Sequence, residues 1–251
     1  MSGVLSVLRR AKPPAVPPGR LVYAVGDIHG RADLLENMLA QIETDRRSGP
    51  VHGAPTIVFI GDYVDRGLRS RDVIERILAL ASEGYEPIFL KGNHEAAMLT
   101  FMDQPQTGPT WFALGGAETL YSYGVAAPKP TASPTVLRFA ARALRAAMPP
   151  THLNFLARLK LHAQLGNYLF VHAGLRPGES LEKQTETDML EIRAPFLNSR
   201  RRWPFVIVHG HTPVESVDRK KTRIAIDTGA YATGKLSALR LEGDGVKVLT
   251  T

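Results

Sequence analysis

Short apolar runs that end in glycine-containing polar turns recur along the chain, and helical spacing follows the first two of them. Residues 20–27 (RLVYAVGD) have the pattern of a buried strand, and residues 32–45 place apolar side chains on one helical face. The same order returns with a strand over residues 55–62 and a helix over residues 70–84, for which Ser70 is the candidate N-cap. This alternation predicts an α/β fold with a largely parallel sheet in its first half.

Further strand patterns begin at Glu86 and return in the last third of the chain. They lie within residues 86–95, 167–174, 204–213, 223–231, 236–243 and 245–251. The last two follow each other closely, which predicts an antiparallel pair. Residues 96–165 are typical of a helical insertion, and the proline-rich residues 1–20 predict a flexible leader. We therefore expect residues 21–251 to form a single domain.

Composition limits the classes of protein to be considered. A hydrophobic content of 44% over 251 residues is enough for a packed core, and no apolar run approaches the roughly 20 residues that a membrane-spanning helix needs. The start of the chain does not resemble a secretory signal, and the absence of cysteine rules out disulfides and thiolate chemistry. We expect a soluble, cytoplasmic protein with no membrane partner.

The net charge of +7 mildly favours anionic partners. Two clusters contribute to it, RRR at residues 200–202 and RKK at residues 219–221. Nucleic-acid binding would need aromatic or groove-reading residues beside these clusters, and none is expected there. We interpret both clusters as solvated surface, so no specific nucleic acid is expected as a partner. The oligomeric state has no signature in the sequence.

The polar residues gather just after the apolar runs. The loops are GDIHG with Asp27 and His29, GDYVDRG with Asp62, Asp65 and Arg66, GNHE with Asn93, His94 and Glu95, HAG with His172, and HGHT with His209 and His211. In open α/β sheets, ligands bind at the carboxyl ends of the strands, which is where all of these loops lie. One such loop would be an ordinary turn, but the repetition of the same residue types predicts a shared site.

Aspartate, histidine and asparagine without cysteine are the ligands that Mn²⁺, Fe, Zn²⁺ or Mg²⁺ accept in proteins. The loops supply more ligands than one ion needs. Two ions about 3.5–4 Å apart could share a carboxylate and lower the pKa of a bridging water, giving a hydroxide able to attack phosphorus.

Two other motifs are incomplete. GAYATGKL (residues 229–236) follows the phosphate-loop pattern until Leu236, which stands where Ser or Thr would hold Mg²⁺. HEAAM (residues 94–98) starts like a zinc-protease helix, but Met98 occupies the place of the second histidine. Both are interpreted as chance matches.

The motifs GDIHG, GDYVDRG and GNHE, followed by HAG and HGHT, resemble the phosphoprotein phosphatase family of metallophosphoesterases, in particular its bacterial and phage-like serine/threonine phosphatase branch. The resemblance extends from about Leu21 to Leu241. It implies the calcineurin-like fold, a central β-sandwich of mixed sheets flanked by helices. It also implies two divalent ions per chain, with Mn²⁺ preferred. The implied metal ligands are Asp27, His29, a bridging Asp62, Asn93, His172 and His211.

The resemblance further implies how a phosphate would be handled. Arg66, Arg193 and Asn93 would bind its oxygens, a task that suits the planar donor fork of a guanidinium. His94 would protonate the departing alkoxide, with Asp65 orienting its imidazole. His209 does not fall on the family's GHT histidine and is expected either to support the ligands or to have a structural role, while Asp227 could belong to the site or to a turn.

The leading functional hypothesis is hydrolysis of phosphoserine and phosphothreonine in proteins or peptides by a metal-bridging hydroxide. The alternative is a dinucleoside polyphosphate hydrolase, such as a diadenosine tetraphosphate hydrolase, which would take a nucleotide substrate. Those relatives tend to have a changed DRG loop and an Asp after GNH, whereas this chain has Asp65 and Glu95, so the motifs favour the phosphatase. A remote alternative is an inactive phosphate-binding scaffold, which should have lost a ligand.

Overall fold

Two five-stranded sheets form the centre of this computed structural model, which describes residues 12–49 and 53–251. The first sheet has the order β10-β9-β1-β2-β3. Its strands are β1 (Leu21–Val25), β2 (Thr56–Phe59), β3 (Glu86–Phe89), β9 (Ser237–Glu242) and β10 (Gly245–Thr250). The second sheet has the order β4-β5-β6-β8-β7. Its strands are β4 (His162–Leu165), β5 (Tyr168–Val171), β6 (Val206–His209), β7 (Asp218–Arg219) and β8 (Arg223–Ala225).

The strand directions agree with the alternation seen in the sequence. β2 pairs in parallel with both β1 and β3, placing Tyr23 opposite Ile57 and Ile57 opposite Pro87. The closing strands β9 and β10 are antiparallel to each other, and β9 is antiparallel to β1. The predicted α/β class and the mixed sheets flanked by helices are therefore confirmed.

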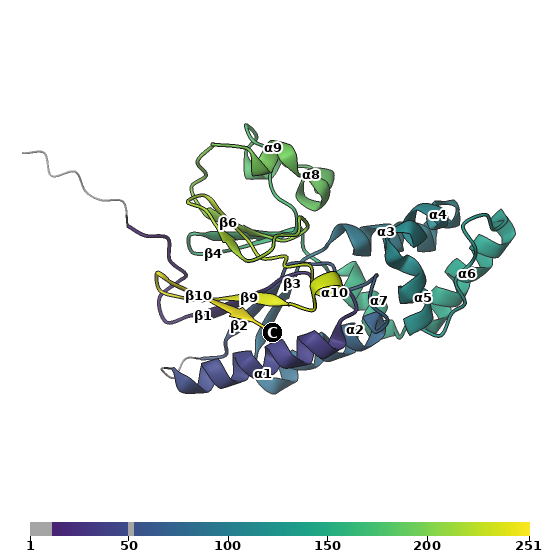
Figure 1. Ribbon diagram of the computed structural model, residues 1–251, viewed down its shortest axis with the longest axis horizontal. Helices are drawn as coiled ribbons and strands as arrows, with labels where there is room; N and C mark the ends of the chain where they lie inside the picture. The colour runs from purple at the N-terminus through teal and green to yellow at the C-terminus, as the bar shows by residue number, and fades with distance from the viewer. Residues whose placement is uncertain (1–11, 50–52) are drawn as a thin grey trace, which may run out of the picture.

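Alternate residues of β1 belong to two different hydrophobic cores, because successive side chains of a strand point to opposite faces of the sheet. Tyr23 and Val25 pack with apolar residues of α1 (Ala32–Ser48) and α2 (Ser70–Ala79). Val22 and Ala24 face the other way and pack against the second sheet. Figure 1 shows the resulting layers, with α1 and α2 below the first sheet and the second sheet stacked above it.

The helices over residues 32–45 and 70–84 form where the sequence predicts them, with one correction at the start of α2. Ser70 is the first helical residue and not the N-cap, which is Arg69 without a side-chain cap bond. The Ser70 hydroxyl is instead within hydrogen-bond distance of the Asp65 backbone N–H and of the Thr119 hydroxyl. The last part of the expected helix, Leu80–Glu83, is a 3₁₀ turn (η1).

Between β3 and β4 the chain forms the helices seen at the right of Figure 1. They are α3 (Asn93–Asp103), η2 (Pro105–Thr107), α4 (Gly108–Trp111), the π-helical η3 (Phe112–Gly116), α5 (Ala117–Ser122), α6 (Pro134–Ala147) and α7 (Pro150–Ala157). The last four residues of the segment expected to be helical form β4 instead. The remaining helices are η4 (Leu181–Lys183), α8 (Glu186–Glu191), α9 (Ala194–Leu197) and α10 (Ala230–Thr233).

Where it is described, the proline-rich start contacts a turn of each sheet. Val16 is buried, its N–H donates to the Gly243 carbonyl, and the Ala15 carbonyl accepts from Asn167 N–H. Residues 1–11 of the expected leader lie outside the described residues. No helix in the described ranges is both long and apolar enough to cross a membrane.

Candidate active site

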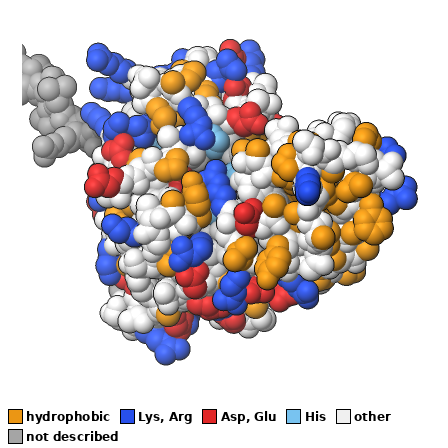
Figure 2. Space-filling view, turned by 45° about the vertical axis from the view of Figure 1, so that its right-hand side comes forward, with side chains coloured by type: hydrophobic (Ala, Val, Ile, Leu, Met, Phe, Trp, Pro, Cys, Tyr) orange, Lys and Arg blue, Asp and Glu red, His pale blue; other side chains and the backbone are white. Residues whose placement is uncertain are grey.

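The predicted site residues meet at one end of the sandwich, because the strands that precede them end there. Asp27 and His29 follow β1, Asp62 follows β2, and His94 is in the first turn of α3. His172 follows β5 and His211 follows β6 in the second sheet, so both sheets contribute. All six side chains are buried. In Figure 2 histidines are visible in a hollow beside basic side chains.

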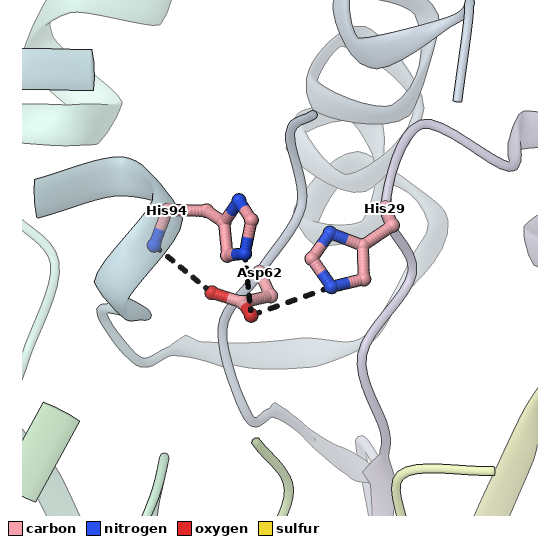
Figure 3. Close-up of side chains that lie close together, drawn as sticks. All are labelled: His29, Asp62 and His94. Atoms are coloured by element: carbon pink, nitrogen blue, oxygen red, sulfur yellow. Dashed lines mark hydrogen bonds and ion pairs between the residues drawn. The ribbon is translucent and has the colours of Figure 1, made fainter. Parts of the chain in front are cut away.

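Asp62 lies at the centre of this cluster. One group of possible ligand atoms, from His29, Asp62 and His94, lies within 4.8 Å of one another. A second group, from Asp62, His172 and His211, meets the same limit, so Asp62 belongs to both groups. Figure 3 shows the first group, with the imidazoles of His29 and His94 on either side of the Asp62 carboxylate. A carboxylate in this position is suited to bridge two ions.

Two of the buried histidines donate from Nδ1 to a backbone carbonyl. The lone pair on Nε2 of each ring then faces another hydrogen-bond acceptor. His29 Nδ1 is 2.9 Å from the Val64 carbonyl and must donate to it, which leaves Nε2 facing Asp62 Oδ2 at 3.4 Å. His172 Nδ1 donates to the Ile60 carbonyl in the same way, at 3.0 Å. Burial lowers the pKa of both imidazoles well below its ordinary value, so both are neutral. A cation between such acceptors would turn a repulsive contact into ligation.

Two buried polar atoms without a hydrogen-bond partner support this interpretation. They are Asp27 Oδ1 and His211 Nε2. Burial raises the pKa of the Asp27 carboxyl well above its ordinary value, and the neighbouring Asp227 raises it further. Burial also raises the pKa of Asp62, with Asp27 as the next cause. Because buried carboxylates and unpartnered ring nitrogens need a cation, the residues present fit divalent metal ions.

Asn93 joins the second group through its side chain. Its Oδ1 is 3.0 Å from His172 Nε2 and 3.0 Å from His211 Nδ1. An amide oxygen between two imidazole nitrogens matches the predicted ligand set.

His94 contacts both Asp65 and Arg66. Its Nδ1 is 2.7 Å from Asp65 Oδ2, and its Nε2 is 3.3 Å from Arg66 Nη2. A guanidinium can only donate, so in this arrangement Nε2 accepts and the proton of the neutral ring lies on Nδ1. The Asp65 carboxylate therefore lies where it can orient the His94 imidazole, and Nε2 is 3.8 Å from Asp62 Oδ2.

The Asp65 carboxylate is fixed by two residues that the sequence interpretation missed. Trp111 Nε1 donates to Asp65 Oδ2 at 2.9 Å, and Thr119 Oγ1 donates to Asp65 Oδ1 at 2.7 Å. Both residues come from the helical segment after β3, and all three side chains are buried. No local pattern in the sequence distinguishes this tryptophan or threonine from residues of an apolar core.

Glu95 also has a role that the motif alone did not reveal. Its buried carboxylate accepts the backbone N–H groups of Asp62, Tyr63 and Gly92 at 2.8–2.9 Å, and that of Val64 at 3.2 Å. These bonds connect the GNHE loop to the GDYVDRG loop. Glu95 could be found in the sequence as part of the GNHE motif. The motif did not show that its partners are backbone N–H groups.

Backbone strain is concentrated in the same loops. The non-glycine residues with positive φ in the described ranges are His29, Asp62, Asp65, Arg66 and His211. Each such residue costs about 1–3 kcal/mol and persists only where its surroundings enforce it. Gly92 and Gly210 make room below the ligands, because a Cβ at either would lie 2.0 Å from a carboxylate oxygen of Asp62 or Asp27.

The remaining predicted residues lie around this centre. Arg193 is exposed, and after burial its charge is the next cause lowering the pKa of His211 to about 3. Asp227 lies close enough to raise the pKa of Asp27, and its Oδ1 accepts from Gly229 N–H as a turn residue would. His209 is in neither ligand group: its Nε2 is 3.4 Å from Arg223 Nη1, and burial lowers its pKa to about 4.

Known proteins resemble this chain over most of its length. The family described as calcineurin-like phosphoesterase matches residues 21–249. A bis(5'-nucleosyl)-tetraphosphatase PrpE [asymmetrical] from Bacillus thuringiensis is 29% identical over 232 residues, covering 86% of this chain and 88% of the relative.

Solved structures give the same fold. A crystal structure of a candidate diadenosine tetraphosphatase has 21% identity and a TM-score of 0.64, covering 95% of this chain and 98% of its own. A cold-active protein-tyrosine phosphatase from a psychrophilic Shewanella has 17% identity and a TM-score of 0.55, covering 94% of this chain and 83% of its own.

Proposed function

Because this chain belongs to the calcineurin-like phosphoesterase family, we propose that it hydrolyses the phosphoanhydride bonds of dinucleoside polyphosphates, with diadenosine tetraphosphate as the model substrate. Membership makes the chain a phosphoester hydrolase of a family that uses divalent metals. The observation that carries the narrower proposal is the similarity to bis(5'-nucleosyl)-tetraphosphatase over 86% of the chain. The comparisons therefore favour the alternative from the sequence over a protein phosphatase.

We assign Asp27, His29 and Asp62 to one ion, and Asp62 with Asn93, His172 and His211 to the other. Mn²⁺ is the proposed metal, with Fe, Zn²⁺ or Mg²⁺ as substitutes. When bound, such ions polarise a phosphoryl oxygen and lower the pKa of a water molecule. The buried histidines are already neutral and directed by their Nδ1 hydrogen bonds, so they are prepared for ligation.

Arg66 and Arg193 would hold the polyphosphate chain. Arg66 Nη2 contacts His94 Nε2, so a phosphate that draws Arg66 toward itself also frees the imidazole nitrogen. With Nε2 free, His94 could take up a second proton from solvent and pass it from Nε2 to the leaving oxygen, returning to the neutral ring, while Asp65, held by Trp111 and Thr119, accepts from Nδ1–H throughout. A nucleotide phosphate is a weakly basic leaving group, because its second pKa is about 6, so it depends little on that proton.

A second candidate function is hydrolysis of phosphoserine or phosphothreonine, and the buried His94–Asp65 pair is the observation that favours it. An alkoxide is far more basic than a nucleotide phosphate and needs protonation as it leaves. A histidine fixed by a carboxylate, itself held by two further side chains, meets that need.

A side-by-side assay tests the proposal. Purified protein would be given diadenosine tetraphosphate, phosphoserine, phosphothreonine and phosphotyrosine peptides, and mononucleotides, each with Mn²⁺, Zn²⁺ and Mg²⁺. We expect kcat/KM for the dinucleotide to exceed that for every peptide by at least tenfold, and Asp62→Asn protein to lack all activities. A peptide preference would replace the proposal by the second candidate, and chromatography of the products would show which anhydride bond is cleaved.

A further inference from the structure

A second cavity lies at the opposite end of the strands that lead into the active site. β6 and β8 are parallel neighbours, and their carboxyl ends lead to His211 and Asp227. Their amino ends are preceded by the segments 202–205 and 221–222, which line a cavity of about 610 Å³ together with Lys12 and Asn167. This cavity shares no lining residue with the active site, and its volume is in the range of small-molecule sites.

The cavity gathers positive charge from three distant parts of the sequence. Lys12, Arg202 and Lys221 all line it, and none of them has an ion-pair partner within the described residues. The residues outside the description, 1–11 and 50–52, contain no Asp or Glu that could serve as a partner. The neighbouring Lys220 and Arg223 differ, because both are paired with Asp218. Unpaired cations around one cavity favour an anionic ligand.

The cavity also has an aromatic wall. The rings of Trp203 and Phe205 lie nearly parallel, at 12°, with centroids 6.0 Å apart. Arg201 places its guanidinium carbon 5.5 Å from the centroid of the Trp203 ring. Aromatic faces beside cations are the arrangement on which planar bases stack while their phosphates are neutralised.

These aromatics correct an expectation from the sequence. Neither basic cluster was expected to have an aromatic neighbour, yet Trp203 directly follows the 200–202 cluster. The parallel pairing of β6 and β8 then brings the 219–221 cluster to the same wall.

We propose that this cavity binds a nucleoside polyphosphate, with its base against Trp203 and Phe205 and its phosphates on Lys12, Arg202 and Lys221. Trp203 and Phe205 supply the flat apolar surface, and the three cations supply the charge that a triphosphate requires. The site is separate from the metal ligands and does not rest on the proposed dinucleotide hydrolysis.

Binding of ATP to full-length protein in EDTA tests the proposal. The chain has two tryptophans, and Trp111 is 1% exposed, so quenching of fluorescence by ATP would report Trp203. We expect ATP to bind at least tenfold more tightly than either adenosine or tripolyphosphate, because base and phosphates are both needed. Tripolyphosphate binding as tightly as ATP, or no ATP binding at 1 mM, would refute the site.

Charge-reversal variants distinguish ATP binding in this cavity from general electrostatic attraction to a basic protein. Arg202→Glu with Lys221→Glu should weaken ATP binding at least tenfold, whereas Arg138→Glu with Arg142→Glu on α6 changes the net charge equally and should leave it within twofold. Arg66→Ala should leave the ATP-dependent quenching of Trp203 unchanged, since Arg66 does not line this cavity. Equal losses in the two double variants, or a loss in Arg66→Ala, would overturn the assignment.

A milder change guards against misfolding. Lys221→Gln should weaken ATP binding about threefold with an unchanged thermal unfolding midpoint. Trp203→Leu, assayed by equilibrium dialysis of labelled ATP, should weaken ATP at least fivefold and leave the weak binding of tripolyphosphate unaltered. Unchanged ATP affinity in Trp203→Leu would exclude the stacking role.

Discussion

Arg66 lies over the ring of Tyr231, with its guanidinium carbon 4.4 Å from the ring centroid. The same ring meets His29 edge-on at 5.6 Å, so one exposed aromatic contacts both a proposed phosphate-binding residue and a proposed metal ligand. The Tyr231 side chain is 42% exposed. If Arg66 binds phosphate as proposed, the ring packed against its guanidinium should help to position it.

Tyr231→Leu should therefore raise KM for the best substrate about three- to tenfold, with kcat changed less, because a partly exposed cation–π contact contributes about 0.5–1 kcal/mol and aligns the donor fork. Tyr231→Phe keeps the ring and should restore the wild-type KM. Tyr121→Leu replaces another exposed tyrosine and serves as the matched control. A normal KM in Tyr231→Leu would show that Arg66 does not need the ring.

Asp62→Asn should abolish both metal retention and hydrolysis. Asp62 belongs to both ligand groups, so its loss weakens two sites together. We expect at least a thousandfold lower kcat and loss of the rise in thermal midpoint that Mn²⁺ gives the wild-type protein. Metal analysis and thermal unfolding measure this, with the exposed Asp103→Asn as control. Retention of two ions per chain in Asp62→Asn would contradict the bridging assignment.

Metal binding should also release protons. Burial raises the pKa values of Asp27 and Asp62 in the metal-free protein, so both carboxyls take up protons at a higher pH than in the unfolded chain. The metal-free protein should consequently lose stability as the pH rises from about 4 through the raised pKa values, and Mn²⁺ should reverse that loss. Calorimetry in buffers of different ionisation enthalpy would count the protons, and a release of none would refute the argument.

His94→Asn should change activity according to the leaving group. For alkyl phosphates, which leave as strongly basic alkoxides, we expect a loss of about 10²–10³ in kcat. For p-nitrophenyl phosphate and for dinucleotides the loss should be about tenfold or less, because these groups leave without a proton. A plot of log kcat against leaving-group pKa should become steeper in the variant. An equal loss for all substrates would assign His94 to metal binding, which its place in the first ligand group also permits.

Trp111→Phe should lower kcat about tenfold without changing KM. The phenyl ring preserves packing on Phe101, whose ring centroid is 4.9 Å away, but removes the N–H that donates to Asp65 Oδ2. A lost hydrogen bond to a charged group corresponds to about 1.5 kcal/mol or more. Trp203→Phe is the matched control and should leave hydrolysis unaffected. Wild-type kcat in Trp111→Phe would mean that Thr119 alone fixes the carboxylate.

Asp45→Asn should destabilise the fold in a pH-dependent way. Burial raises the pKa of Asp45, but hydrogen bonds from Lys247 and Tyr23 outweigh it, and the pKa lies below its ordinary value. The stabilisation is therefore complete above the unfolded pKa of about 4 and is lost as the pH falls through the lower folded value. We expect the variant to unfold about 2–3 kcal/mol more easily at pH 7, with the difference shrinking at pH 3. Urea denaturation measures this, and exposed Asp244→Asn should show no such pH dependence.

The local patterns predicted much of this molecule from the sequence. Continuous apolar runs such as TIVF identified β2, and the spacing of Leu35, Met38 and Ile42 identified α1. The meeting of the loops at one site could be predicted from topology, because parallel strands have their carboxyl ends at the same edge of a sheet. β4 was missed although HAQL alternates polar and apolar residues, because four residues directly after a helical pattern are too few to identify a strand.

The parts that could not be predicted depend on contacts between distant residues. Trp111 and Thr119 reach Asp65 across about fifty positions of sequence, and nothing near either residue signals an acceptor. Glu95 was interpreted as a mark of substrate class, whereas its hydrogen bonds to four backbone N–H groups give it a structural task. For that reason the presence of Glu95, where those relatives tend to have Asp, argues less strongly against dinucleotide hydrolysis than the sequence suggested.

The strand order has a consequence for how the enzyme is made. β1, which leads directly to Asp27, pairs with β2 on one side and with β9 on the other, and the Gly26 N–H donates to the Ser237 carbonyl. A ribosome synthesises β1 long before β9. The loop that carries Asp27 can therefore reach its final place only after β9 has been made and has paired with β1.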